Sequence, residues 1–191
     1  MKVTFVYPKT SYFYDHTPYP PLGIGYLAAT IRDLVSDIDC VDGQILSNEE
    51  YTEAITAIKS DVICISATLL QMKESCKVAD IVKARLPSTP IIIGGYGPHS
   101  LPPQDLFRIG KFDIFIRGEG ELLLRRVLDC LKQGADLKEI SGIAFVHDEE
   151  IISTGPNPEL PRLDSLPLPD RGLFNIPLYL KTWRQNVSMT S

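Results

Sequence analysis

Five short apolar segments alternate with amphipathic segments along the first 134 residues, and this alternation constrains the fold more than any other feature. Several apolar segments are hydrophobic at successive positions, so both faces of the strands that they predict must be covered. A doubly wound α/β fold follows, with five parallel strands in the expected order 2-1-3-4-5. The predicted strands lie at 2–8, 37–43, 61–67, 90–95 and 111–118. The predicted helices lie at 21–35, 47–60, 71–87, 101–110 and 119–134.

The pattern changes after residue 140. Residues 142–155 read as a β-hairpin that turns at 148–150. Six prolines then fall between Pro156 and Pro177, a density typical of an extended linker. We therefore expect an α/β domain at 1–140, a hairpin extension at 141–155 and a proline-rich linker at 156–191.

Composition and charge exclude several classes of protein. The net charge is −5, which gives no electrostatic basis for binding nucleic acid. No apolar run approaches the ~20 residues that span a bilayer, and Met1 leads straight into a strand-like segment. We expect no membrane or nucleic-acid partner, no signal peptide and a cytoplasmic location. The four cysteines form no C-x-x-C pair and the three histidines no H-x-x-x-H pair, so a self-contained zinc site is not predicted.

Ligands of doubly wound sheets bind beyond the carboxyl ends of the strands, so the loops at these ends are the candidate site. Three of the loops carry glycines or hydroxyl groups suited to close backbone approach and hydrogen bonding. They are 66–69, 94–99 and 118–121. Each could also be an ordinary turn between strand and helix, but their convergence on one edge favours a site.

A dinucleotide fingerprint is a competing interpretation. Gly23, Gly25 and Ala28 fit G-x-G-x-x-G/A, and Asp42 follows the first glycine by 19 residues. The fingerprint needs its first glycine directly after the strand, whereas the first strand ends near Tyr7, some 15 residues earlier. We expect Gly25 to lie inside the following helix and to serve close packing.

The order of features resembles the N-terminal cobalamin-binding domain of cobalamin-dependent radical SAM enzymes. The motifs that carry the resemblance are "PPLGIGYLAATIRD", "VICISAT", "IIIGGYGPHS", "DIFIRGEGE", "SGIAFVHDEEII" and "LDSLPLPDR". The resemblance implies that a radical SAM barrel follows the linker as the partner of this domain. It also implies that the iron–sulfur cluster and S-adenosylmethionine belong to that barrel. We expect the 191 residues to be a fragment that ends before the cluster motif, with no catalysis of its own.

Related cobalamin domains carry D-x-H-x-x-G, S-x-L and G-G motifs, and the resemblance aligns them with this sequence. Ser66-Ala67-Thr68 takes the S-x-L place, and 25 residues separate it from Gly94-Gly95. Counting back 42 residues from Ser66 reaches Gly23, so the cobalt-ligating histidine falls on Pro20. The resemblance implies cobalamin bound without a protein histidine on cobalt. The implied cofactor-binding residues are Pro20, Leu22, Gly23, Ser66, Ala67, Thr68, Leu69, Gly94, Gly95, Tyr96, His99, Gly118, Glu119 and Gly120.

Other residues near the first loop leave alternatives open. His16 follows Asp15 in this loop and is a rival cobalt ligand, although it lacks the D-x-H spacing. Nearby aromatic residues could pack on the corrin or form a domain contact; they are Tyr12, Phe13, Tyr14 and Tyr19. His99 could bond a cofactor amide or lie at the surface.

Three functional hypotheses remain at this point. The first is a cobalamin-binding domain whose parent enzyme performs methyl transfer or related radical, oxidative or ring-forming chemistry. The second is a degenerate domain that kept the fold and serves the barrel as a scaffold or lid. The third is a dinucleotide-binding domain.

Overall fold

The computed structural model describes residues 1–10, 18–157 and 159–189, and within these ranges one sheet of seven strands forms the centre of the molecule. The strand order is β2-β1-β3-β4-β5-β6-β7, and the first five strands along the chain pair in parallel. The strands are β1 (Lys2–Tyr7), β2 (Asp37–Asp42), β3 (Val62–Ser66), β4 (Ile91–Gly94), β5 (Ile114–Ile116), β6 (Ile143–His147) and β7 (Glu150–Ser153). The α/β class and the 2-1-3-4-5 order are confirmed.

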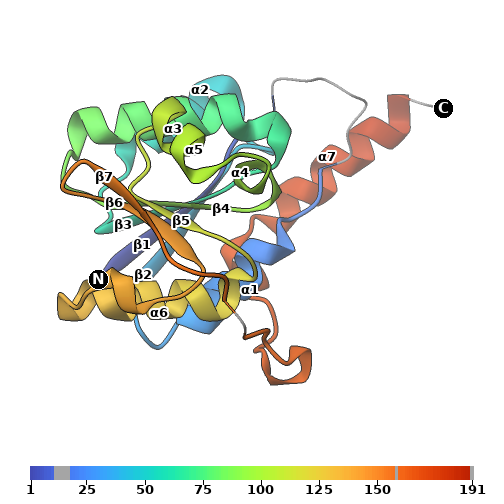
Figure 1. The fold of residues 1–191 in the computed structure, drawn as a ribbon. Coiled ribbons are helices and arrows are strands. Elements are labelled where there is room, and N and C mark those ends of the chain that lie inside the picture. Colours follow the sequence, from blue (N-terminus) through green and yellow to red (C-terminus); the bar gives the residue numbers. More distant parts are fainter. Residues whose placement is uncertain (11–17, 158, 190–191) are drawn as a thin grey trace.

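Helices cover both faces of this sheet (Figure 1). Apolar side chains of α1 and α6 join one core cluster, and those of α2, α3 and α5 join the other. The helices are α1 (Leu22–Ile31), α2 (Asn48–Ala57), α3 (Met72–Arg85), α4 (Tyr96–His99), α5 (Pro103–Ile109), α6 (Gly120–Gln133) and α7 (Ile176–Met189). Two apolar layers around doubly buried strands are what the sequence pattern predicts.

Two helix ends form as their sequence signals predict. The Ser47 hydroxyl accepts a hydrogen bond from the Glu50 amide at 3.1 Å, and the Glu50 carboxylate accepts one from the Ser47 amide at 2.8 Å. This capping box satisfies two amides at the start of α2. Gly134 ends α6 with φ +65°, a left-handed conformation that glycine adopts without steric cost.

The hairpin enlarges the sheet beyond the five predicted strands. β6 pairs antiparallel with β5, and β7 pairs antiparallel with β6. The residues of the hairpin turn, Asp148 and Glu149, have φ of 49° and 66°. The hairpin therefore completes the edge that β5 would otherwise leave open.

The proline content predicted an extended linker after residue 155, but the segment is only partly extended. Phe174 and Tyr179 are buried in the core, and residues 176–189 form the helix α7 (Figure 1). Pro177 stands in the first turn of α7, where proline costs no helical hydrogen bond. The amide of Asp170 also donates to the Gly25 carbonyl of α1 at 2.9 Å, so this segment is fixed to the domain.

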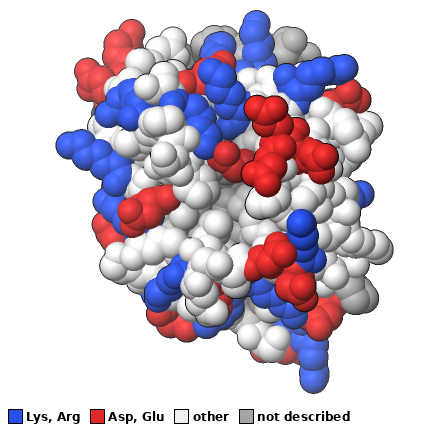
Figure 2. All heavy atoms as spheres, turned by 60° about the vertical axis from the view of Figure 1, so that its left-hand side comes forward, with Lys and Arg blue, Asp and Glu red and all other residues white. Residues whose placement is uncertain are grey.

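Surface charge, helix hydrophobicity and the grouping of metal-ligating side chains indicate which partners the chain could bind. On the face shown in Figure 2, positive and negative side chains are interspersed. Within the described ranges, no helix combines the length and hydrophobicity that crossing a membrane requires. Among the described residues, there is no group of three or more His, Cys, Asp or Glu side chains that could hold a metal ion.

Candidate functional site

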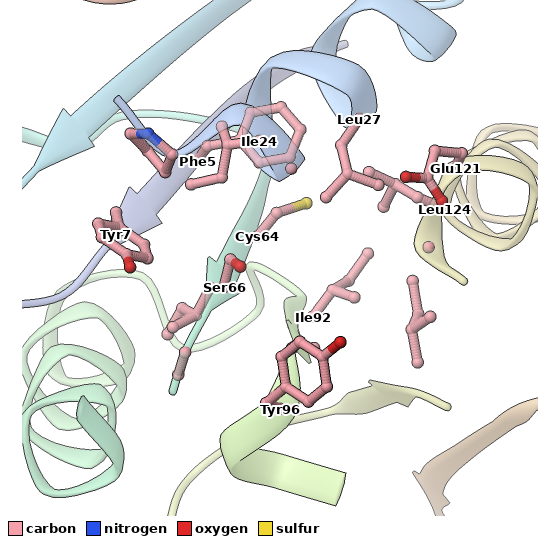
Figure 3. Close-up of a pocket in the computed structure, with 18 of the residues that line it drawn as sticks. Phe5, Tyr7, Ile24, Leu27, Cys64, Ser66, Ile92, Tyr96, Glu121 and Leu124 are labelled. Carbon is pink, nitrogen blue, oxygen red and sulfur yellow. The ribbon is translucent and has the colours of Figure 1, made fainter. Parts of the chain in front are cut away.

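A cavity of about 640 Å³ opens at the carboxyl edge of the sheet, where β1, β3, β4 and β5 end (Figure 3). Its side walls come from α1 and from the start of α6. Eleven of the fourteen predicted site residues line it: Gly23, Ser66, Ala67, Thr68, Gly94, Gly95, Tyr96, His99, Gly118, Glu119 and Gly120. Pro20, Leu22 and Leu69 are not in its lining. The structure thus brings together the three loops on which the sequence analysis relied.

The floor of the cavity is apolar and was not predicted. It consists of inward-facing strand and helix residues that also belong to the core: Phe5, Cys64, Ile92, Ile116 and Leu124. Cys64, Ile92 and Ile116 lie two positions before the predicted loops, so the alternation of a strand could have identified them. Burial raises the pKa of the Cys64 thiol, which makes it an inert part of this apolar floor.

Gln71 organises the loop after β3 and was not predicted, although Thr68 and Gln71 have the T-x-x-Q spacing of a capping box, which could have identified it. Its side chain is fully buried, and its carbonyl oxygen accepts from both the amide and the hydroxyl of Thr68, at 2.8 and 2.9 Å. Its amide nitrogen donates to the Pro8 carbonyl at 2.6 Å, just beyond β1. The Thr68 hydroxyl hydrogen is therefore already used, so toward a ligand this hydroxyl offers only its lone pairs.

The Gly94-Gly95 turn fits tightly against the loop after β3. Gly95 has φ +98° and ψ 179°, a region that is essentially restricted to glycine. A Cβ atom there would lie 2.7 Å from the Ala67 carbonyl oxygen. That same carbonyl accepts from the Gly97 amide at 2.9 Å. The two loops are thus joined by backbone contacts that a side chain at position 95 would prevent.

His99 joins the loop after β4 to the loop after β5. Its Nε2 accepts from the Gly118 amide at 2.7 Å, so the ring hydrogen is on Nδ1, which donates to the Gly95 carbonyl at 2.8 Å. The ring also meets Phe115 edge-on, with 5.4 Å between centroids. Both nitrogens are occupied by backbone groups, so His99 positions the loops rather than presenting a free nitrogen.

Glycines bring α6 close to α1 at the cavity wall. A Cβ at Gly120 would lie 2.9 Å from Leu27 of α1, whereas a Cβ at Gly23 or Gly118 would meet nothing within 4 Å. Gly23 and Gly118 therefore leave open space at the cavity, and Gly120 permits helix contact. The next residue, Glu121, also lines the cavity and was not predicted as a site residue.

Large apolar side chains remain exposed around this edge. Tyr96 is 91% exposed, and Leu69 and Leu70 are 63% and 53% exposed. Tyr19 is 66% exposed and lies 5.3 Å from Trp183 of α7, between ring centroids. Such a rim around an apolar cavity is typical of a surface that a broad ligand or another domain covers.

The residues of the dinucleotide interpretation lie elsewhere. Gly23 stands inside α1, 16 residues after β1 ends at Tyr7, rather than in the first tight turn. Asp42 is buried at the end of β2, where its carboxylate accepts hydrogen bonds from the Tyr179 hydroxyl and, at 3.0 Å, from the Gln44 amide. Gly25 packs as predicted: a Cβ there would lie 3.1 Å from Pro169 and 3.3 Å from Phe174.

Among the remaining histidines and cysteines that the structure describes, only Cys64 lines the cavity. His147 ends β6 and pairs with Asp148 at 3.5 Å, outside the cavity lining. His16, Tyr12, Phe13 and Tyr14 lie outside the described residues. The four cysteines are free thiols, buried or half-buried, as expected: Cys40, Cys64, Cys76 and Cys130.

Comparison with known proteins shows a match to one family model and to curated relatives that are much longer than this chain. A family model described as "B12 binding domain" matches residues 15–128. The uncharacterized methyltransferase PH0819 of Pyrococcus horikoshii is 28% identical over 94% of this chain, which spans 40% of that protein. An anaerobic magnesium-protoporphyrin IX monomethyl ester cyclase of Synechocystis is 30% identical over 76% of this chain, which spans 30% of it.

Two solved structures share the fold. The radical enzyme OxsB, solved with aqua-cobalamin and S-adenosylmethionine bound, superposes with a TM-score of 0.78 at 22% identity. That match covers 95% of this chain and 25% of OxsB. The methyltransferase TsrM of Kitasatospora setae, solved with cobalamin and a [4Fe-4S] cluster, gives a TM-score of 0.67 at 16% identity. That match covers 87% of this chain and 31% of TsrM.

Proposed function

Because this chain belongs to the B12-binding domain family, we propose that it holds cobalamin for a larger radical SAM enzyme. The observation that carries the proposal is the apolar cavity at the carboxyl edge of the sheet, inside the residues that the family model matches, apart from the two strand positions Phe5 and Tyr7. Its volume of about 640 Å³ lies within the usual range of small-molecule sites.

The residues at this edge fit the cofactor. Cobalamin has a broad corrin ring and a long nucleotide tail. We propose that the cavity, with its apolar floor and the glycines in its walls, receives the tail. Gly23 and Gly118 leave the space that a side chain would fill, and the exposed apolar rim suits a broad ring. When bound, the cobalt supplies the methyl-transfer or radical chemistry. The chain itself binds, orients and shields the cofactor.

We further propose that no protein histidine ligates the cobalt. Pro20, which takes the histidine position, has no ligating side chain. Both nitrogens of His99 are engaged by Gly95 and Gly118. His147 lies outside the cavity lining. His16 remains the one histidine to test by substitution.

The rest of the enzyme is inferred from the relatives' lengths. The chain spans 40% of PH0819 and 30% of the Synechocystis cyclase, so a larger catalytic part is proposed as its partner. In that arrangement residues 1–140 carry the cofactor, the hairpin at 141–155 completes the sheet, and residues 156–191 lead to a radical SAM barrel. The barrel would hold the iron–sulfur cluster and S-adenosylmethionine.

A reconstitution experiment tests the proposal. The purified chain is mixed with hydroxocobalamin and desalted, and its visible spectrum is recorded. Retained corrin bands support the proposal, whereas a colourless protein favours the scaffold or lid alternative. The bands should persist unchanged in His16→Ala, and their loss would identify His16 as a ligand. A parallel titration with NAD should show no micromolar binding, since such binding would revive the dinucleotide alternative.

A further inference from the structure

We propose that Glu121 recognises the polar part of the group that fills the cavity, by accepting a hydrogen bond from an O–H or N–H donor on it. The inference rests on the proposed cobalamin binding and deepens it, because it assigns one carboxylate of this chain to the nucleotide tail. Glu121 lies in the first turn of α6 and lines the cavity.

The described residues leave the carboxylate of Glu121 incompletely satisfied. Its Oε2 atom is buried and has no hydrogen-bond partner among the described residues. Figure 3 shows the side chain beside Leu27 and Leu124, at the edge of the open space. A buried carboxylate oxygen without a partner is costly, so such atoms are rare in folded proteins unless a ligand completes them.

The position of Glu121 at the start of a helix does not by itself explain why one of its carboxylate oxygens is buried. Acidic residues in a first turn are favoured by the helix dipole, but they can remain in solvent while doing so. Glu119, two residues earlier, is exposed in this way. The other buried oxygen without a partner among the described residues, the Tyr51 hydroxyl, belongs to the opposite core layer and lies outside the cavity.

The chemistry of the carboxylate limits what it can bind. A carboxylate accepts hydrogen bonds and donates none, so it pairs with a hydroxyl or an amine. In the tail of cobalamin the free ring nitrogen of the benzimidazole base carries no hydrogen, and the ribose carries hydroxyl groups. An adeninyl base would add an exocyclic amine. The tail thus offers a ribose hydroxyl or a base amine, whereas the corrin ring offers the N–H groups of its amide side chains. Glu121 lines the cavity that is proposed to receive the tail, so the inference assigns the donor to the tail, and the corrinoid without a nucleotide tests this assignment.

The test compares three corrinoids by spectral or calorimetric titration. Hydroxocobalamin carries the benzimidazole tail, the adeninyl cobamide carries an adenine tail, and aquacobinamide carries no nucleotide. In Glu121→Leu the affinity for hydroxocobalamin should fall about ten- to hundredfold, the range for a hydrogen bond to a charged group. The affinity for aquacobinamide should stay within threefold. Glu121→Gln keeps an acceptor oxygen, so its affinity for hydroxocobalamin should fall less than that of Glu121→Leu.

Controls separate the possible outcomes. Glu53→Gln, an exposed site on α2, should bind all three corrinoids like the unsubstituted chain. A preference for the adeninyl cobamide that disappears in Glu121→Leu identifies a base amine as the donor, and equal losses for both tailed corrinoids identify the ribose. Equal losses for aquacobinamide, or no loss at all, overturn the inference. If the unsubstituted chain binds no corrinoid, the proposed function fails first and this inference fails with it.

A stability measurement distinguishes recognition from a structural role. Removing an unsatisfied carboxylate should leave the cofactor-free Glu121→Leu chain at least as resistant to denaturant as the unsubstituted chain. A lower denaturation midpoint in the cofactor-free state would show that Glu121 supports the fold, and would overturn the inference.

Discussion

Gln71, His99 and Asp42 are polar side chains that tie together segments far apart in the sequence. Gln71 links the loop after β3 to the end of β1, and His99 links the loops after β4 and β5. Asp42 links the end of β2 to Tyr179 of α7, 137 residues away. Gln71 and Asp42 are buried, so their polar atoms would be costly to bury without these partners. His99 is exposed, and its two hydrogen bonds join two loops that line the cavity.

His99→Ala should loosen the loop after β5. The substitution removes both loop contacts, and the loss of two hydrogen bonds should cost about 1–3 kcal/mol of unfolding free energy. The Gly118 amide should lose its protection against hydrogen exchange. His99→Gln offers an acceptor oxygen at a similar reach and should restore part of that protection. An unchanged exchange rate at Gly118 in His99→Ala would contradict the assigned bond.

Asp42→Asn should change how stability depends on pH. Burial raises the pKa of Asp42 above the exposed value of 3.8, against the smaller opposite effect of the Tyr179 hydroxyl. A raised pKa means that folding favours the protonated acid, so this contribution is full below pH 3.8 and is lost as pH rises through the raised value. Asparagine does not titrate. The unfolding free energy of Asp42→Asn relative to the unsubstituted chain should therefore increase from pH 3.5 to 7.

Denaturant unfolding at several pH values measures this difference. Tyr179→Phe is the matched second variant, because it removes the hydroxyl that donates to Asp42. It should cost about 1–3 kcal/mol at pH 7, the usual range for leaving a buried acceptor without its donor. If the difference in unfolding free energy between Asp42→Asn and the unsubstituted chain does not depend on pH, Asp42 has the same pKa in the folded and the unfolded state, which contradicts the prediction.

At the scale of elements, α1 has two different faces that both depend on glycine. Gly23 faces open space at the cavity, and Gly25 contacts the segment around Pro169 and Phe174. That segment is held further by the hydrogen bond from Asp170 to Gly25 and by the ion pair between Arg32 and Asp170. One helix thus forms the cavity wall and anchors the C-terminal segment.

Substitutions of the two glycines should have opposite effects on stability. Gly25→Leu introduces a side chain where Pro169 and Phe174 already pack, and overpacking of this kind costs about 1–3 kcal/mol. Gly23→Ala meets no atom and removes backbone freedom from the unfolded chain, so it should stabilise by about 0.5–1 kcal/mol. Denaturant unfolding of both variants checks this. Equal destabilisation would contradict the different packing of the two positions.

At the scale of the whole molecule, the cavity lies at the point where the strand order reverses. β1 is followed in space by β2 on one side and β3 on the other, and residues near the ends of β1 and β3 line the cavity. Connections leave these two strands toward opposite faces, so a crevice opens between them. The hairpin extends the far edge of the sheet and leaves this crevice unobstructed.

Cobalamin should stabilise the whole domain by mass action. At a free cofactor concentration of about 100 times Kd, a ligand that binds only the folded chain adds about 2.7 kcal/mol. For a chain of this length that corresponds to a rise in Tm of about 5–10 °C. Thermal melts with hydroxocobalamin and with NAD at equal concentration measure the effect. No rise with hydroxocobalamin, or an equal rise with NAD, would contradict the proposed specificity.

The sequence by itself determined the α/β class, the parallel order of the first five strands and the loops that meet at the cavity. These follow from local hydrophobic periodicity and from the rule that parallel strands end at one edge. Gly95 and the capping box of Ser47 were also evident, because turn and cap chemistry is local.

Only the tertiary structure decided how distant segments meet. Three contacts join segments that are distant in the sequence, and the local pattern of one segment does not predict the other. They are the pairing of β6 with β5, the hydrogen bond of Tyr179 to Asp42 and the hydrogen bond of Gln71 to Pro8. Glu119 and Glu121 show this most clearly, because they stand in the repeated G-E-G-E sequence with the same local signal. Both line the cavity, but α6 packs against Leu27 of α1 at Gly120, and there one oxygen of Glu121 is buried whereas Glu119 is exposed.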